Sequence, residues 1–186
     1  MADRVEQLIE RARSLDLQGL PDEQIDFFWE TIDRWQPDFI AEWGTNTGST
    51  ARLLYEASVI RGLSLQVHST DHNQTATDAE GRARGHFCLD SPVILHVGDG
   101  LEISVGEANS AQSQRPLFFI DDNKEPEETR HALYALEAIF PKAVILIHDV
   151  RPTAHGQSHE VCRFAFARTN SYALECYANM MRLVPR

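Results

Sequence analysis

Short apolar runs alternate with amphipathic segments along most of the chain. Short apolar runs are typical of buried strands, whereas apolar residues three and four apart indicate helices. The runs predict strands at 39–43, 63–69, 92–97, 116–120 and 143–147, then a pair of strands at 172–177 and 180–184. Helices are expected at 3–14, between Pro21 and Pro37, after Gly48, after Gly100, at 126–139 and at 159–168. Strand and helix therefore follow one another in regular order.

Four of these strands lack the alternation of polar and apolar residues that a half-exposed strand shows. The runs at 39–43, 92–97, 116–120 and 143–147 are almost continuously apolar, which is typical of strands covered by helices on both faces. The pattern predicts an α/β fold, a Rossmann-like doubly wound and mostly parallel sheet of about seven strands with a C-terminal antiparallel hairpin. We expect a single domain, with N-terminal helices in residues 1–36 and a cofactor-binding core in residues 37–186.

Composition narrows the choice of partners. The 186 residues carry a formal net charge of -11, which argues against nucleic acid and an anionic membrane surface, because both attract clustered Lys and Arg. With no apolar run of transmembrane length and no signal-peptide pattern, a cytoplasmic protein is expected. Cys88, Cys162 and Cys176 form no CxxC pair, and we expect reduced, mostly buried thiols.

Polar residues stand at the ends of five predicted strands. In an open parallel sheet, ligands bind beyond the carboxyl ends of the strands, so these residues mark the expected site. A single Asp at such a place is more often a helix cap or turn residue, but five polar ends at one edge favour function. The residues are Glu42 and Gly44, Asp71 and His72, Gly98 and Asp99, Asp121 and Asp122, and His148 and Asp149.

The turn after the first strand is the most informative segment. Asn46 stands where a dinucleotide-binding GxGxxG turn has its second glycine, and no Lys follows Gly48 as a Walker loop requires. Glu42 would repel phosphates and suits a ligand with a cationic amino group. The turn therefore favours a zwitterionic nucleoside over NAD or ATP, held by Glu42, Gly44, Thr45, Asn46, Thr47, Gly48 and Thr50.

Two further strand ends complete the expected cofactor site. Asp71 can accept hydrogen bonds from both hydroxyls of a ribose, with His72 beside it. Asp99, between Gly98 and Gly100, can bind an adenine amino group, although a GDG sequence also occurs in ordinary turns.

These residues resemble class I S-adenosylmethionine-dependent methyltransferases. More narrowly, they look like the metal-dependent O-methyltransferases of the catechol and caffeoyl-coenzyme A type and their bacterial relatives, over roughly residues 36–152. The family pattern E-x-G-x-x-T-G-x-[ST] is matched by Glu42, Gly44, Thr47, Gly48 and Thr50. The resemblance implies S-adenosylmethionine as cofactor, with its methionine part in this turn and its ribose on Asp71.

The resemblance also implies a metal and a base. The family motif D-x-x-K matches Asp121 to Lys124, which makes Asp121 a metal ligand beside the cofactor and Lys124 the general base. Asp149 matches the second ligand, but Val150 stands where the family often has Asn, so His148 or Asp122 is the substitute ligand. A related D-G-x-H version would make Asp122 the ligand and place Glu125 at the base position. Oxygen ligands suit Mg²⁺, whereas His148 favours a transition metal.

The expected reaction moves a methyl group from the sulfonium of the cofactor to a hydroxyl of a small molecule, with catalytic roles for Lys124 and His148. A divalent cation would lower the pKa of that hydroxyl. We expect a homodimer through the N-terminal helices. Two alternatives stay open: a non-catalytic cofactor-binding protein of the same fold, and an NAD(P)-dependent oxidoreductase, which the missing GxGxxG disfavours.

Overall fold

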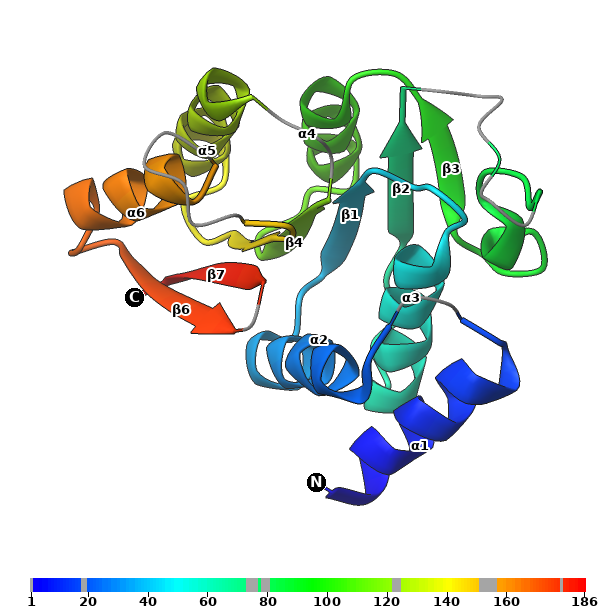
Figure 1. Cartoon of the computed structure of the whole chain (residues 1–186). Helices are drawn as coiled ribbons and strands as arrows, with labels where there is room; N and C mark the ends of the chain where they lie inside the picture. Colours follow the sequence, from blue (N-terminus) through cyan, green and yellow to red (C-terminus); the bar gives the residue numbers. More distant parts are fainter. Residues whose placement is uncertain are drawn as a thin grey trace.

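A seven-stranded sheet forms the centre of the molecule in the computed structural model (Figure 1). The structure describes residues 2–17, 20–72, 77, 81–121, 125–150, 157–177 and 179–186. The helices are α1 (Ala2–Ser14), α2 (Asp22–Trp35), α3 (Ser49–Arg61), the 3₁₀ turn η1 (His86–Cys88), α4 (Gly100–Ser110), α5 (Pro126–Ile139) and α6 (Gln157–Ala167). The strands are β1 (Phe39–Trp43), β2 (Val67–Asp71), β3 (Ile94–Val97), β4 (Pro116–Ile120), β5 (Val144–Ile147), β6 (Tyr172–Tyr177) and β7 (Met180–Pro185).

The strand order is β3-β2-β1-β4-β5-β7-β6. The first five strands in this order run parallel, and β7 lies antiparallel between β5 and β6. The order reverses between β1 and β4, where Trp43 is paired with Ile120. Ligands bind beside such a reversal at the carboxyl ends of the strands. The expected fold, a mostly parallel doubly wound sheet with a C-terminal antiparallel hairpin, is confirmed.

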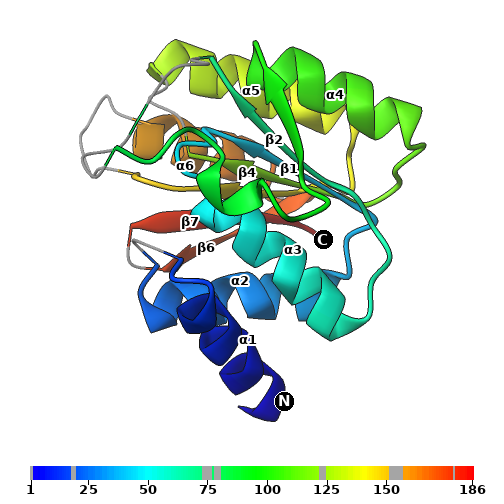
Figure 2. The same ribbon diagram turned by 90° about the vertical axis from the view of Figure 1, so that its right-hand side faces the viewer.

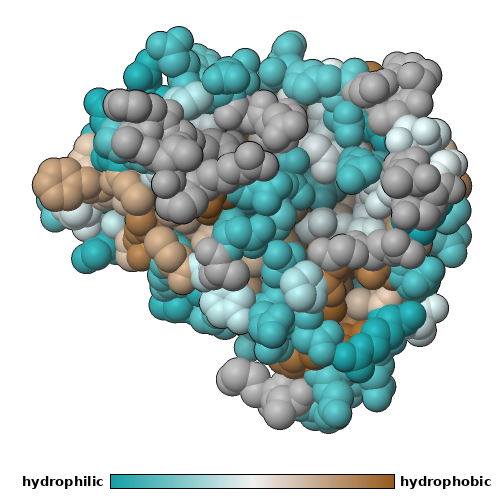
Figure 3. All heavy atoms as spheres, viewed as in Figure 1, coloured by the Kyte–Doolittle hydropathy of each residue, from teal (hydrophilic) through white to brown (hydrophobic). Residues whose placement is uncertain are grey.

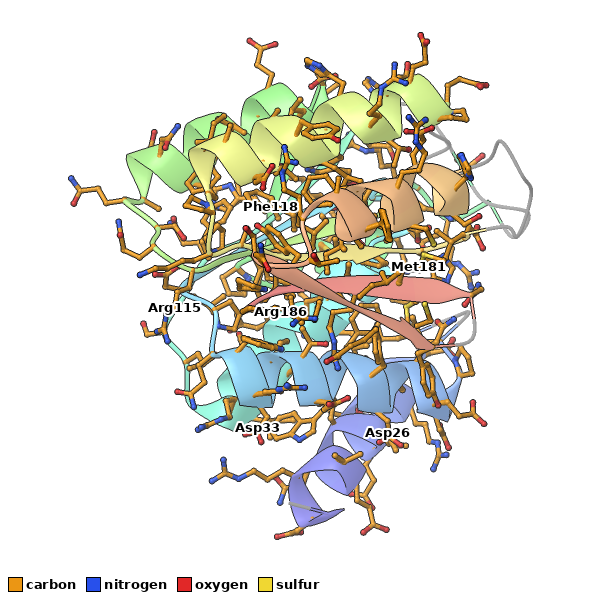
Figure 4. The ribbon with its side chains drawn as sticks, turned by 90° about the vertical axis from the view of Figure 1, so that its left-hand side faces the viewer. Asp26, Asp33, Arg115, Phe118, Met181 and Arg186 are labelled. Carbon is orange, nitrogen blue, oxygen red and sulfur yellow. The ribbon has the colours of Figure 1, made fainter. Side chains whose placement is uncertain are left out.

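Helices cover both faces of the sheet. Seen from the side, α1, α2 and α3 lie below the sheet and α4 and α5 lie above it (Figure 2). Successive residues of β1 point to opposite layers, so Ile40 packs in the core under α2 and α3 while Ala41 packs in the core under α4 and α5. Phe118 of β4 points into that second layer (Figure 4). Burial on both faces explains the continuous apolar runs of β1, β4 and β5.

The predicted strand at 92–97 differs from this pattern. β3 is one of the two edge strands of the sheet, and its side chains are alternately half-buried and exposed, with Leu95 and Val97 open to solvent. An apolar run does not reveal whether a helix lies over it, so the prediction of a strand buried on both faces was wrong here. β2 also begins at Val67 rather than at residue 63, because Gly62 ends α3 and residues 63–66 only connect the two elements.

The surface is mainly hydrophilic on the face shown in Figure 3, with apolar side chains at the free end of α6. That helix carries Phe166, which is 84% exposed. The prediction of mostly buried thiols was wrong for two residues, since Cys88 is buried but Cys162 and Cys176 are exposed. Among the described residues, no helix has the length and apolar character needed to cross a membrane.

Candidate cofactor and catalytic site

The turn after β1 is a tight backbone loop. Gly44, Asn46 and Gly48 all have positive φ, at 97°, 44° and 85°. Gly48 caps the N-terminus of α3, and a Cβ there would lie 2.7 Å from the Cys88 sulfur. Glycine is therefore needed at position 48 both for its conformation and for the close approach of the chain.

A second segment holds this loop in place. The backbone N–H of Gly85 donates to the carbonyl of Asn46 at 2.8 Å, and that of Phe87 donates to Thr47 at 3.0 Å. These bonds tie the loop to η1 and leave the first turn of α3 facing a cavity. The helix N-terminus at Ser49 is a favourable place for a negatively charged ligand group.

Glu42 lies beneath the loop and is 1% exposed. Ser69 donates to its carboxylate at 2.5 Å, and the Ser69 oxygen lies 2.8 Å from the hydroxyl of Thr45. The pKa of Glu42 is raised to about 8, chiefly by burial and also by the charges of Asp121 and Asp71, against the effect of the Ser69 hydrogen bond. A cationic group placed nearby would favour the carboxylate form of Glu42.

Asp71 stands at the end of β2 and contacts the loop directly. Its Oδ2 accepts a hydrogen bond from the backbone N–H of Asn46 at 3.1 Å and lies 3.7 Å from the guanidinium Nε of Arg84. Arg84 also donates to the hydroxyl of Thr45 at 3.4 Å and to the carbonyl of His96. Sequence reasoning missed Arg84, since it lies in a polar stretch without a motif.

A second hollow of about 330 Å³ opens on the other side of the strand ends. His72, Asp99 and Leu101 line it from one side, and α5 lines it from the other with Glu127 and His131 among its residues. Asp99 also caps α4, because its Oδ1 accepts from the backbone N–H of Glu102 at 2.8 Å. Gly98 has a φ of 145° and donates to the carbonyl of Asp71 at 3.1 Å, which joins the ends of β2 and β3.

An acid–histidine cluster follows β4 and β5. The Nδ1 of His148 lies 2.9 Å from Asp121 Oδ1 and 3.6 Å from Asp149 Oδ1. The hydrogen bond to Asp121 raises the pKa of His148 against the opposing effect of burial. Because an ionised Asp121 can only accept, the proton lies on Nδ1 and the Nε2 lone pair of neutral His148 is left for another donor.

Two amides lie against that Nε2 atom, and both were missed from the sequence. Gln24 of α2 places its Nε2 at 3.3 Å, and Asn179 of the β6–β7 turn places its Nδ2 at 3.2 Å. Asn179 also donates to Asp149 at 3.2 Å. Val150, where the family often has Asn, packs into the core instead. Asn179 thus brings an amide to the cluster from elsewhere in the chain.

The loop and the cluster share one cavity of about 160 Å³. Its lining comes from the β1 turn, from the ends of β4 and β5, and from α2 with the segment just before it, where Leu20, Gln24 and Phe28 form one wall. The structure thus brings Gly44, Thr45, Asn46, Thr47, Thr50, Asp121 and His148 together around one space. Asp122 and Lys124 lie outside the described residues.

Solved structures with the same architecture belong to methyltransferases. A methyltransferase from Geobacter sulfurreducens matches with a TM-score of 0.60 and 14% identity, over 99% of this chain and 88% of that one. The O-methyltransferase TomG from Streptomyces achromogenes, in complex with SAM, gives a TM-score of 0.57 and 18% identity over 98% and 90%. The fold is that of the S-adenosylmethionine-dependent methyltransferases.

The Mg-SAM structure of CmcI has the same methyltransferase fold, with a TM-score of 0.61 and 14% identity over 89% of this chain and 72% of that one. No family model and no curated protein sequence matches the chain. The resemblance expected from the β1 turn and from Asp71 is therefore confirmed in the fold. The chain is similar to these methyltransferases in the arrangement of its strands and helices, whereas its sequence identity to them is low.

Proposed function

We propose that the chain is an S-adenosylmethionine-dependent O-methyltransferase that acts on a small hydroxylated molecule. The observation that carries the proposal is the cavity in which the β1 turn and the Asp121–His148 pair face one another. A donor bound by the turn and an acceptor deprotonated by the pair would meet in this space. Positioning two reactants in this way is the main contribution an enzyme can make when the methyl donor is already activated.

The cofactor would lie across the carboxyl ends of the strands. Its methionine part would occupy the β1 turn, where its ammonium group faces the buried Glu42. Its ribose hydroxyls would bind Asp71, which now accepts from Asn46 and lies beside Arg84. The adenine would enter the hollow that Asp99 and His72 line. TomG, which has this fold, is described in complex with SAM.

His148 would accept the proton of the acceptor hydroxyl. Asp121 holds Nδ1 of the ring, His148 lines the cavity, and its Nε2 atom lies within reach of the amides of Gln24 and Asn179. An acceptor hydroxyl that displaced one amide could donate to Nε2. General-base catalysis of this kind contributes about 10²–10⁴-fold. Phe28 and Phe119 form apolar walls, which suit an acceptor with a ring.

The donor set also fits a divalent cation. The ligand atoms of Asp121, His148 and Asp149 all lie within 4.8 Å of one another, and the Asn179 amide adjoins Asp149. We propose that these residues hold Mg²⁺ or a transition metal, with Asp122 as a further ligand. When bound, such an ion would lower the pKa of a hydroxyl that contacts it. A His148 ring that binds such an ion cannot also accept the proton of the acceptor hydroxyl, so in the metal-bound form Lys124 would be the base.

Other parts of the proposal rest on charge and sequence pattern. The net charge of -11 supports a small molecule rather than nucleic acid as the partner. A cytoplasmic location and a homodimer through the N-terminal helices stay predictions.

Labelled methyl transfer from S-adenosylmethionine to a panel of phenols and sugars tests the proposal, with Mg²⁺ and with a chelator. We expect His148→Gln to lower kcat/KM by about 10²–10⁴-fold on an accepted substrate, with little change in affinity for S-adenosylhomocysteine. His86→Gln, at an exposed histidine of η1, is the matched control. Tight cofactor binding without transfer to any acceptor would contradict the proposal and favour a non-catalytic cofactor-binding protein.

A further inference from the structure

A second group of metal-ligating side chains lies away from the proposed active site, between the sheet and α4. His68 of β2, His96 of β3 and Glu107 of α4 place their ligand atoms within 4.8 Å of one another. Strand pairing sets this meeting, because Thr70 is opposite His96 and His68 is opposite Ile94. The Asp121 cluster follows β4 and β5, on the other side of β1 in the strand order, so the two groups are separate.

The two histidine rings are already aligned. They stack with an interplanar angle of 11° and a centroid distance of 5.1 Å, and His68 Nδ1 lies 2.9 Å from His96 Nε2. Two ligand atoms on one tetrahedral zinc ion lie about 3.3 Å apart, given metal–nitrogen bonds of about 2.0–2.1 Å. The two nitrogens now share one hydrogen bond. An ion would replace it once the shared proton has moved to the other nitrogen of its ring, and the two nitrogens would then need to separate by only a few tenths of an ångström.

His68 is suited to metal binding by its surroundings. Its side chain is 3% exposed and packs against the ring of Phe39, at a centroid distance of 4.9 Å. Burial lowers the pKa of His68, with His96 adding to the effect and Glu107 opposing it, which favours the neutral ring that a metal ligand needs. Among the described residues, its Nε2 is buried and has no hydrogen-bond partner. A proton on Nε2 leaves the Nδ1 lone pair directed at the cluster.

Glu107 supplies the charge that two neutral imidazoles lack. Its Oε2 lies 3.9 Å from His68 Nδ1, and its side chain is 41% exposed, so it can move toward an ion. Two histidines and one carboxylate form a known zinc donor set, with a water completing the tetrahedron. Mg²⁺ prefers oxygen ligands, so this set favours a transition metal.

We propose that His68, His96 and Glu107 form a second metal site that binds Zn²⁺ or a similar transition-metal ion. The ion would join the edge strand β3 to β2 and to α4. The carbonyl of His96 accepts from Arg84, which lies beside Asp71, so the site also adjoins the proposed ribose-binding residues. The proposal does not depend on methyltransferase activity.

The test is a titration of the full chain with Zn²⁺ and, in parallel, with Co²⁺, whose visible absorption reports tetrahedral coordination. An Asp121→Asn/Asp149→Asn background removes the other cluster. In this background we expect one equivalent of Zn²⁺ to bind and raise the Tm, because an ion that binds the folded state stabilises it. His96→Gln should weaken that binding more than about tenfold, and Glu107→Gln should weaken it less.

His86→Gln, at an exposed histidine outside both clusters, should leave the affinity unchanged. Both test residues are partly exposed, so their variants are expected to fold, and circular dichroism would establish that they do. Equal Zn²⁺ affinity with and without His96→Gln, or the absence of a bound equivalent in this background, would overturn the proposal.

Discussion

At the scale of single residues, His148 and Glu42 differ in what their surroundings do to a proton. A hydrogen bond to Asp121 keeps the proton on His148, which raises the pKa of that ring. Burial keeps the proton on Glu42, which raises the pKa of that carboxyl to about 8. His148 is thus suited to accept a proton, whereas Glu42 is suited to lose its proton when a cationic ligand approaches. Each effect can be measured separately.

The pKa of His148 should fall in the Asp121→Asn variant. The hydrogen bond to a carboxylate is the largest cause of the raised value, and the opposing effect of burial would remain. In the native protein, the charged pair stabilises the fold below the unfolded pKa of about 6.5, and this contribution is lost as pH rises through the higher folded value. NMR titration of the His148 ring measures both forms. An unchanged pKa in the variant would contradict the assigned pairing.

The Glu42→Gln variant should be more stable than the native protein at pH 8. The raised pKa means that ionisation of Glu42 opposes folding as pH rises from its usual range toward about 8. Gln keeps an acceptor for the Ser69 hydroxyl without a charge to bury. We expect a gain of about 1–3 kcal/mol in the free energy of unfolding, measured in urea, and a flatter pH dependence. S-adenosylhomocysteine should bind more weakly, because its ammonium group loses the carboxylate.

At the scale of elements, the turn between β1 and α3 depends on the close approach of Gly48 to Cys88 and to the backbone of Gly85. Gly48→Ala should destabilise the fold by about 1–3 kcal/mol, since Ala is strained at a φ of 85° and its Cβ would meet the Cys88 sulfur. Gly62→Ala is a matched control, because its φ is 82° but nothing lies within 4 Å of the added carbon. Urea unfolding of both variants separates strain from crowding.

Removing the sulfur provides the second half of this test. The Cys88→Ala change should recover part of the loss in Gly48→Ala, and it should recover nothing in Gly62→Ala. Equal losses in the two single variants would show that backbone strain alone acts at position 48.

Helices and strands were predicted well where the pattern of apolar residues within the segment itself defines them. β1, β4 and α5 agree with the predicted ranges, because their apolar period or continuous run has clear ends at Pro37, Pro116 and Pro126. The exposure of β3 was not predictable, since a run of apolar residues does not indicate whether its strand lies at an edge of the sheet. Arg84, Gln24 and Asn179 were missed for a related reason. They meet the site through tertiary contacts, without a motif in their own segments.

At the scale of the whole molecule, the sheet order brings residues far apart in the chain to one edge. The residues at the strand ends could be chosen as site candidates from the sequence, because parallel strands all end at the same edge of the sheet. The sequence did not reveal which residues from other elements would contact them. The expected homodimer has an obstacle on α2. Asp26 and Asp33 of that helix (Figure 4), together with Glu23 and Glu30, line a groove beside α1 that also contains Arg34 and the aromatic rings of Phe27, Trp29 and Tyr177. These four acids outnumber the one basic side chain of the lining. A two-fold contact through this groove would oppose like charges, so sedimentation should show a salt-dependent dimer or a different interface.

The most direct test of the proposed function is a calorimetric titration of the full chain with S-adenosylhomocysteine, with a separate titration of NAD⁺ as the control. We expect micromolar binding of the first and none of the second. Asp71→Asn should weaken binding by about 10–100-fold, since hydrogen bonds to a charged group contribute about 1.5–3 kcal/mol. Asp26→Asn, at an exposed residue of α2, should leave it unchanged. Clear binding of NAD⁺ without S-adenosylhomocysteine would contradict the proposed function and leave only the fold.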